Sequence, residues 1–261
     1  MSGFHLKPHD LYRLIGTPAA PRIVDVRRRA AFEADDRALP GASWLDHRET
    51  ERWPLNAGED VVAYCAHGHN VSQMACAALR ARGVRAWTLS EGIEGWKAAG
   101  LPTVKRFDAP HGWITRERPK VDRIACPWFI RRFVDPRASI LFVAADQVEA
   151  VAAESGAVPF DIPGVAFSHD GDDCSFDVFL KRFGVNDSAL LGLAPIVRGA
   201  DTGRPDLAPK CAGLLAASLG ISAETDDDHD ASARGFVVYD ALYAWRCHAL
   251  AEKHGWPPVA L

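Results

Sequence analysis

A single thiol stands where the chain changes from an apolar run to a helical pattern. "VVAYCAHGHNVSQMACAALRARG", residues 61–83, places Cys65 at the end of a strand-like segment, before a short loop and an alanine-rich stretch. Cysteine is a small hydrophobic residue that is often buried, so core packing is one explanation. A helix N-terminus also stabilises a thiolate, so the position equally suits a nucleophile.

The loop after Cys65 has the features of an anion-binding turn. A loop that leads from strand into helix points backbone N–H groups inward, and the helix dipole adds partial positive charge. A glycine in it lets the backbone curl, and two histidines can add donors. We therefore expect the loop to hold the charge of a thiolate or a bound oxyanion through Ala66, His67, Gly68, His69 and Asn70.

Alternating strand and helix patterns surround this thiol. Strand-like runs cover 22–26, 41–46, 61–65 and 85–90, and helical patterns cover 28–34 and 72–83. Alternation at this pace predicts a parallel sheet with helices on its faces.

Three motifs in this order resemble those of the rhodanese family of sulfurtransferases. They are "RIVDVRRRAAFEADDRALPGASWLD", "YCAHGHNVS" and "LSEGIEGWKAAGLP". The resemblance covers about residues 8–104 and implies an α/β rhodanese-like fold. It also implies that Cys65 accepts a sulfane sulfur as a persulfide from a small-molecule donor and passes it to a thiol acceptor, with no cofactor required.

The loop departs from the rhodanese pattern in two ways. Many short rhodaneses have arginine and then serine after the loop glycine, where this chain has "HNVS". The guanidinium that would pair with an anionic donor is therefore missing. The segment from Cys65 to Gly83 is also one residue longer than in short rhodaneses, which fits either a wider loop for larger oxyanions or a longer helix.

The "DVR" motif has two interpretations. Asp25 and Arg27 match it, and they form either an ion pair that locks the strand end or an oxyanion-binding element in which Arg27 takes part. Cys76 lies on the helix after the loop, and we assign it to the core.

Helix signals dominate the second half of the chain. Capped helical patterns cover 172–184, 186–199, 205–220 and 232–255, while 140–144 and 157–162 are the strand candidates. We place a domain boundary near residue 108. This gives a rhodanese-like domain over 1–107 and a mainly α domain with few short strands over 108–261.

"RERPKVDRIACPWFIRRFVDPRA" is rich in arginine and contains a second thiol. Proline suits the first position of a helix, so we expect a helix to begin at Pro127 with Cys126 as its N-cap. One interpretation is a half-buried helix with solvated arginines. The other is a second oxyanion site formed by Arg123, Cys126 and Arg131.

Histidine and aspartate recur at loops and helix starts further on. His169, Asp201 and His229 are nitrogen and oxygen ligands that suit zinc, manganese or iron, although their spacing matches no recognised metal motif. Neighbouring aspartates such as Asp173 and Asp206 are equally well explained as helix N-caps. A transition metal in the second domain is therefore one expectation.

Five stretches of the second half resemble the chromate-resistance protein family. They include "DRIACPWFIRRFVDP", "GAVPFDIPGVAFSHDGDDCSFD" and "VYDALYAWRC", and the similarity runs from about residue 112 to 250. The resemblance implies involvement in tolerance of chromate. That family includes proteins described as chromate-responsive regulators.

The amino-acid composition indicates a globular protein and argues against some classes of partner. The chain of 261 residues is 48% hydrophobic and 25% charged, which is typical of a folded globular protein. Its net charge of -4, with acidic excess in the second half, argues against a nucleic-acid partner. The chain shows no signal-peptide pattern or membrane-length apolar run, so we expect a cytoplasmic protein with free thiols and no membrane partner.

Three hypotheses follow. The first is a sulfurtransferase acting through Cys65, fused to a chromate-resistance domain. The second is a chromate sensor or regulator whose arginines at 116–132 contact phosphate. The third is a metal-dependent enzyme centred on the second domain.

Overall fold

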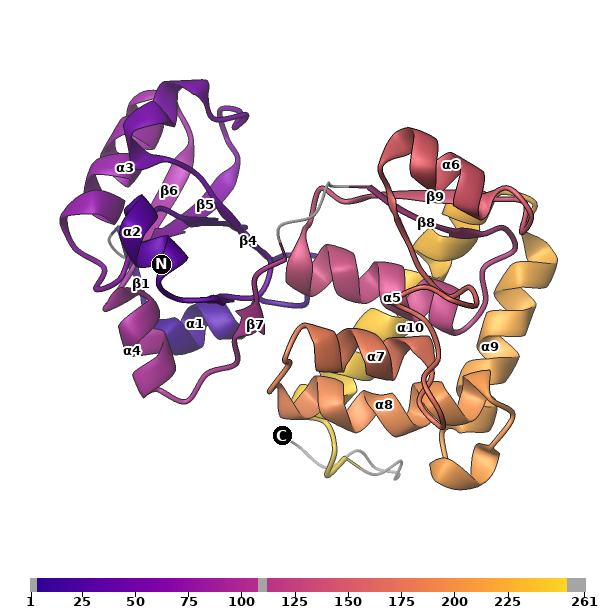
Figure 1. Ribbon diagram of the computed structural model, residues 1–261. Coiled ribbons are helices and arrows are strands. Elements are labelled where there is room, and N and C mark those ends of the chain that lie inside the picture. Colours follow the sequence, from indigo (N-terminus) through magenta and orange to yellow (C-terminus); the bar gives the residue numbers. More distant parts are fainter. Residues whose placement is uncertain (1–3, 108–111, 253–261) are drawn as a thin grey trace.

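The computed structural model describes residues 4–107 and 112–252. Figure 1 shows two lobes side by side, the first built from the N-terminal residues and the second from the C-terminal ones. The predicted boundary near residue 108 falls outside the described residues. None of the helices in these two ranges is long and apolar enough to cross a bilayer.

A five-stranded parallel sheet forms the centre of the N-terminal lobe. Its strand order is β1-β6-β5-β2-β4, and all four neighbouring pairs are parallel. The strands are β1 (His5–Leu6), β2 (Arg22–Asp25), β4 (Ala42–Trp44), β5 (Asp60–Tyr64) and β6 (Arg85–Leu89). The predicted parallel α/β architecture is confirmed.

Helices cover both faces of this sheet because its central strand is apolar on both sides. On β5, Val61 and Ala63 face one core with α3 (Asn70–Ala81) and the 3₁₀ helix η1 (His47–Arg52). Val62 and Tyr64 face the opposite core. That side carries α1 (Pro8–Tyr12) and α4 (Gly92–Ala98), while α2 (Arg29–Glu33) follows β2.

The C-terminal lobe is mainly helical, as predicted. Its helices are α5 (Asp122–Phe129), α6 (Val148–Ser155), α7 (Ser175–Arg182), α8 (Ser188–Asp201), α9 (Cys211–Glu224) and α10 (Asp228–His248). A π-helical turn (Ile130–Val134) extends α5, and a 3₁₀ turn (Pro205–Leu207) precedes α9. The sequence pattern predicted one helix over 205–220, whereas the structure divides this segment.

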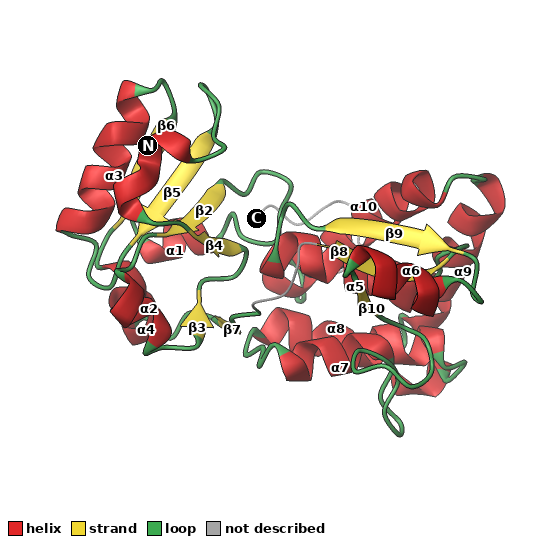
Figure 2. Cartoon of the chain, turned by 45° about the horizontal axis from the view of Figure 1, so that its top comes forward, coloured by secondary structure: helices red, strands yellow, loops and turns green. Residues whose placement is uncertain are grey.

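A small parallel sheet of order β10-β8-β9 lies in this lobe (Figure 2). Its strands are β8 (Gly112–Arg116), β9 (Ser139–Val143) and β10 (Val158–Pro159). The sequence pattern predicted β9 and β10 but not the central strand β8.

One hydrophobic cluster spans both lobes. It runs from Leu6 and Leu11 in the first lobe to Tyr239 and Tyr243 in α10. Two short strands, β3 (Arg37–Ala38) and β7 (Val104–Lys105), pair antiparallel beside the second lobe. The backbone N–H of Lys105 donates to the carbonyl of Phe183 at 2.7 Å, so main-chain hydrogen bonds also cross between the lobes.

Candidate functional site

Cys65 directly follows β5. It begins the loop of residues 65–69, which leads into α3. Its exposed fraction is 8%. His69 occupies the N-cap position of α3 but makes no side-chain capping bond. The first N–H groups of the helix are therefore left for another acceptor at this end.

Hydrogen-bond donors surround the sulfur of Cys65. Its Sγ lies 3.3 Å from the hydroxyl of Ser72, which is fully buried one turn into α3. Burial by itself raises the pKa of Cys65. Hydrogen bonds from the Ser72 hydroxyl and from the backbone N–H groups of Ser72, His67 and His69 outweigh it, so the pKa of this thiol is lowered from its ordinary value. The arrangement favours a thiolate.

The start of α4 orients the loop. Ile93 donates its N–H to the carbonyl of Cys65, and Glu94 donates to the carbonyl of Ala66, both at 3.0 Å. These hydrogen bonds orient the carbonyls of Cys65 and Ala66 toward α4 and away from the sulfur. Gly92, with φ +60°, lets α4 come this close, because a Cβ there would overlap both carbonyl oxygens.

The structure brings together part of the predicted loop set. The backbones of His67 and His69 face the sulfur, whereas both imidazoles and the Asn70 side chain are exposed. Gly68 is buried with φ +72°, and Ala66 is half-buried. Sequence reasoning assigned no role to Ser72, although it is the last residue of the motif "YCAHGHNVS".

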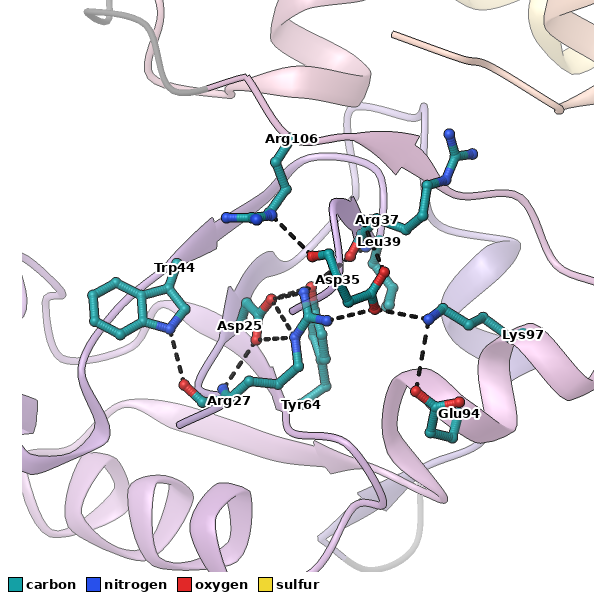
Figure 3. Close-up of polar contacts among 10 residues, drawn as sticks. All are labelled: Asp25, Arg27, Asp35, Arg37, Leu39, Trp44, Tyr64, Glu94, Lys97 and Arg106. Atoms are coloured by element: carbon teal, nitrogen blue, oxygen red, sulfur yellow. Dashed lines mark hydrogen bonds and ion pairs between the residues drawn. The ribbon is translucent and has the colours of Figure 1, made fainter. Parts of the chain in front are cut away.

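Arg27 is not available to an oxyanion, which corrects one of the two interpretations of the "DVR" motif. Its side chain is 2% exposed and forms a bidentate pair with Asp25, with its Nη2 2.6 Å from Asp25 Oδ2. The remaining donors contact Asp35 and the carbonyl of Arg37 (Figure 3). Tyr64 donates to the same Asp25 carboxylate. These contacts occupy the guanidinium, so it locks the ends of β2 and β5 together.

Cys76, which the sequence assigned to the core, is fully buried under the sheet. Its thiol donates to the carbonyl of Trp87 at 3.2 Å, and burial raises its pKa. The two thiols of this lobe therefore differ in the direction of their pKa shifts.

Cys126 does not cap a helix, and the second oxyanion site predicted around it is wrong. α5 begins at Asp122, so Cys126 and Pro127 lie inside the helix, and Cys126 is fully buried. Burial raises the pKa of this thiol well above its usual value, mainly by desolvation. Arg131 donates instead to the carbonyl of Ala138.

Two of the three predicted metal ligands lie together in the C-terminal lobe. His169 Nε2 lies 3.2 Å from Asp201 Oδ2 and 3.7 Å from Asp122 Oδ2. One ligand atom from each of these residues lies within 4.8 Å of the others. His229 is exposed in the first turn of α10 with its ring against Phe142, so including it was wrong.

Asp161 adds a third carboxylate to this group. Its Oδ1 lies 3.5 Å from His169 Nε2 and accepts a hydrogen bond from the Ser175 hydroxyl. Its Oδ2 lies 3.2 Å from Arg116 and 3.8 Å from Arg123. Of the predicted oxyanion residues, Arg123 alone therefore borders this cluster.

Asp122 and Asp161 were missed by sequence reasoning because they come from separate segments, α5 and the loop after β10. The backbone at these positions is unusual, but the spacing of residues in the sequence does not show it. Asp161 itself has φ +52°, and Val121, directly before Asp122, has φ +27°. Such backbone conformations are rare outside glycine and mark positions that tertiary structure holds.

Comparisons with known proteins match both halves of the chain. The model for "ChrB, C-terminal domain" matches residues 113–246, and the model for "Rhodanese-like domain" matches residues 7–99. Protein ChrB of Cupriavidus metallidurans is 34% identical over 132 residues. The match spans 50% of this chain but 39% of that protein.

Solved structures also resemble the N-terminal part. A rhodanese-related protein from Thermoplasma volcanium is 25% identical and covers 39% of this chain and 98% of its own, with a TM-score of 0.34. A thiosulfate sulfurtransferase from Pseudomonas aeruginosa is 28% identical over 38% of this chain and 19% of its own, with a TM-score of 0.32. From the family models, the chain belongs to the ChrB C-terminal domain family and carries a rhodanese-like domain before that domain.

Proposed function

We propose that this protein transfers sulfane sulfur through a persulfide on Cys65, and that this chemistry serves tolerance of chromate through the C-terminal domain. The observation that carries the proposal is the lowered pKa of Cys65 within its ring of donors. Cys76 in the same lobe also has donors, the Thr88 side chain and the Ala63 backbone, but burial outweighs them and its pKa is raised.

The reaction divides into two displacements. The Cys65 thiolate attacks the sulfane sulfur of a donor, the sulfur–sulfur bond of the donor breaks, and the leaving group departs with the electron pair. An acceptor thiolate then attacks the outer sulfur of the persulfide, and Cys65 leaves as a thiolate. The backbone N–H groups of His67 and His69 and the Ser72 hydroxyl stabilise the negative charge on sulfur at both stages.

The charges around the loop favour a donor other than thiosulfate. Arg27 is buried in ion pairs, and the loop itself has no arginine, so the thiolate is held by hydrogen-bond donors without a fixed cation. A dianion gains less at such a site than at one with a guanidinium. A low-molecular-weight persulfide with less charge on its reacting end depends less on such a cation.

The arginines of 116–132 do not favour the alternative of a nucleic-acid-binding regulator. Arg116 pairs with Asp161 and Arg132 with Asp240. Arg118 donates to the carbonyl of Ser222, and Arg131 donates to that of Ala138. A phosphate contact would have to displace these internal partners.

Intact-mass spectrometry tests the proposal. The full chain is incubated separately with thiosulfate and with a small organic persulfide, and the mass of one added sulfur atom is expected with the persulfide. Cys65→Ser should abolish this gain. Cys76→Ser, which removes the other thiol of the lobe, should retain it. A Cys65→Ser protein that still gains one sulfur, or a wild-type chain that gains none from either donor, overturns the assignment.

A further inference from the structure

The C-terminal lobe contains a group of ligand-type side chains that the sulfur chemistry does not use. We propose that it binds one divalent first-row transition-metal ion, Mn²⁺, Fe²⁺ or Zn²⁺, through Asp122, His169 and Asp201, with Asp161 beside them. The group draws on three places in the fold: the first residue of α5, the segment between β10 and α7, and the last residue of α8.

The spacing of the ligand atoms suits a single ion. Ligands about 2.1 Å from one metal lie roughly 3 to 3.5 Å from one another. His169 Nε2 lies 3.2 Å from Asp201 Oδ2, 3.5 Å from Asp161 Oδ1 and 3.7 Å from Asp122 Oδ2. Small movements of these side chains would complete the coordination sphere.

The burial of the Asp122 carboxylate is not explained by ion pairs and hydrogen bonds within the protein. Its carboxylate is 1% exposed, and its Oδ2 accepts a hydrogen bond from the backbone of Phe176. Its Oδ1 has no hydrogen-bond partner among the described residues. A buried carboxylate oxygen without a partner is costly. A cation between Asp122, His169 and Asp201 supplies the missing partner.

Charge also distinguishes Asp122 and Asp201 from Asp161. Asp161 is compensated by Arg116, Arg123 and the Ser175 hydroxyl. The ion-pair partner that the structure gives both Asp122 and Asp201 is the imidazole of His169. Asp122 and Asp201 thus have fewer ion-pair partners than Asp161, and a divalent cation supplies a further one.

The donor set indicates the class of metal. Mg²⁺ and Ca²⁺ prefer oxygen ligands alone, whereas an imidazole nitrogen with carboxylates suits manganese, iron and zinc. Within residues 4–107 and 112–252, the group of possible ligands includes no cysteine. Cys126 is buried inside α5, and the thiol of Cys174 donates to Asp177 at 3.2 Å. We therefore expect a hard or borderline ion rather than copper(I).

Metal uptake by the full chain tests this site. Purified protein is stripped with a chelator and titrated with Mn²⁺, with the loss of the free-ion EPR signal as the readout, and then with Zn²⁺ by calorimetry. We expect one ion per chain. His169→Ala should weaken binding at least tenfold, and its half-exposed side chain makes a folding defect the lesser concern. His229→Ala is the matched control and should bind as the wild type does.

Thermal unfolding supplies a second readout. A bound ion stabilises the folded state by mass action, so at about 100 times the dissociation constant the wild-type Tm should rise by roughly 5–10 °C. Asp122→Asn keeps the shape of the side chain and should abolish this rise. The proposal is overturned if the stripped wild-type chain takes up neither ion, or if His169→Ala and Asp122→Asn bind as tightly as His229→Ala.

Discussion

Asp187 accepts a hydrogen bond from the hydroxyl of Tyr12 at 3.0 Å, although 175 residues separate them in the chain. The same oxygen accepts from Tyr243 in α10 at 2.9 Å. The other carboxylate oxygen caps α8 by accepting from the N–H groups of Ala189 and Leu190. One buried carboxylate thus joins the rhodanese-like part to two helices of the ChrB-type part.

Asp187→Ala should destabilise the whole chain by about 2–5 kcal/mol. It removes a helix cap worth about 1 kcal/mol, leaves the buried Tyr243 hydroxyl without its acceptor at about 1–3 kcal/mol, and costs less than about 1 kcal/mol at the half-buried Tyr12. Urea unfolding followed by fluorescence measures the loss. Asp206→Ala, at an exposed position of the 3₁₀ turn, is the control and should change the free energy of unfolding by less than about 0.5 kcal/mol. An equal effect of the two substitutions would contradict the bridging role.

Arg27→Ala should also act on stability, by about 3–5 kcal/mol. Removing one partner of a buried pair leaves Asp25 as an uncompensated buried charge. Arg29→Ala breaks an exposed pair with Glu33 and should cost less than about 1 kcal/mol. Denaturant unfolding of both variants makes the comparison. If Arg27→Ala leaves stability unchanged but weakens donor binding, Arg27 is a ligand-binding residue after all.

Local patterns predicted the N-terminal half better than the C-terminal half. Strand and helix alternate there, and the apolar periods of 61–65 and 72–83 correspond to β5 and α3. The position of Cys65 followed from that alternation. Ser72 could not be identified as a donor, because its contact with the sulfur depends on how α3 begins.

The C-terminal half depends on longer-range contacts. β8 is a short strand buried between β9 and β10, and its sequence "GWITR" carries no alternation that marks it. Pro127 was expected to begin a helix, yet tertiary packing holds it inside α5 between fully buried neighbours. Residue type and position at loops and helix starts predicted His169 and Asp201. Asp122 and Asp161 join them only through the packing of α5, α7 and α8.

The reactivity of Cys65 should persist to lower pH than that of an ordinary thiol. Because the pKa of Cys65 is lowered, its thiolate persists to lower pH, so the midpoint of its alkylation by iodoacetamide should lie below that of an ordinary cysteine. Ser72→Ala removes a hydrogen bond to the charged form and should raise the midpoint by roughly 1–2 pH units. Met74→Ala, at an exposed position of the same helix, should leave it unchanged. Equal midpoints in wild type and Ser72→Ala would show that the hydroxyl does not stabilise the thiolate.

Gly92→Ala should damage the thiolate cradle through the backbone. At φ +60° a side chain is strained, and its Cβ would overlap the carbonyl oxygens of Cys65 and Ala66. Strain of about 1–2 kcal/mol and overpacking of about 1–3 kcal/mol should together lower stability by about 2–5 kcal/mol.

Gly100→Ala separates these two contributions. Gly100 has a similar φ of +69° but nothing within 4 Å of a Cβ, so its substitution should cost only the strain. Alkylation of Cys65 in the folded protein provides the functional readout. Displacing the two carbonyls from α4 turns them toward the sulfur, so the alkylation midpoint of Gly92→Ala should rise, while that of Gly100→Ala should stay at the wild-type value. A Gly92→Ala protein with an unshifted midpoint would mean that α4 does not orient the loop.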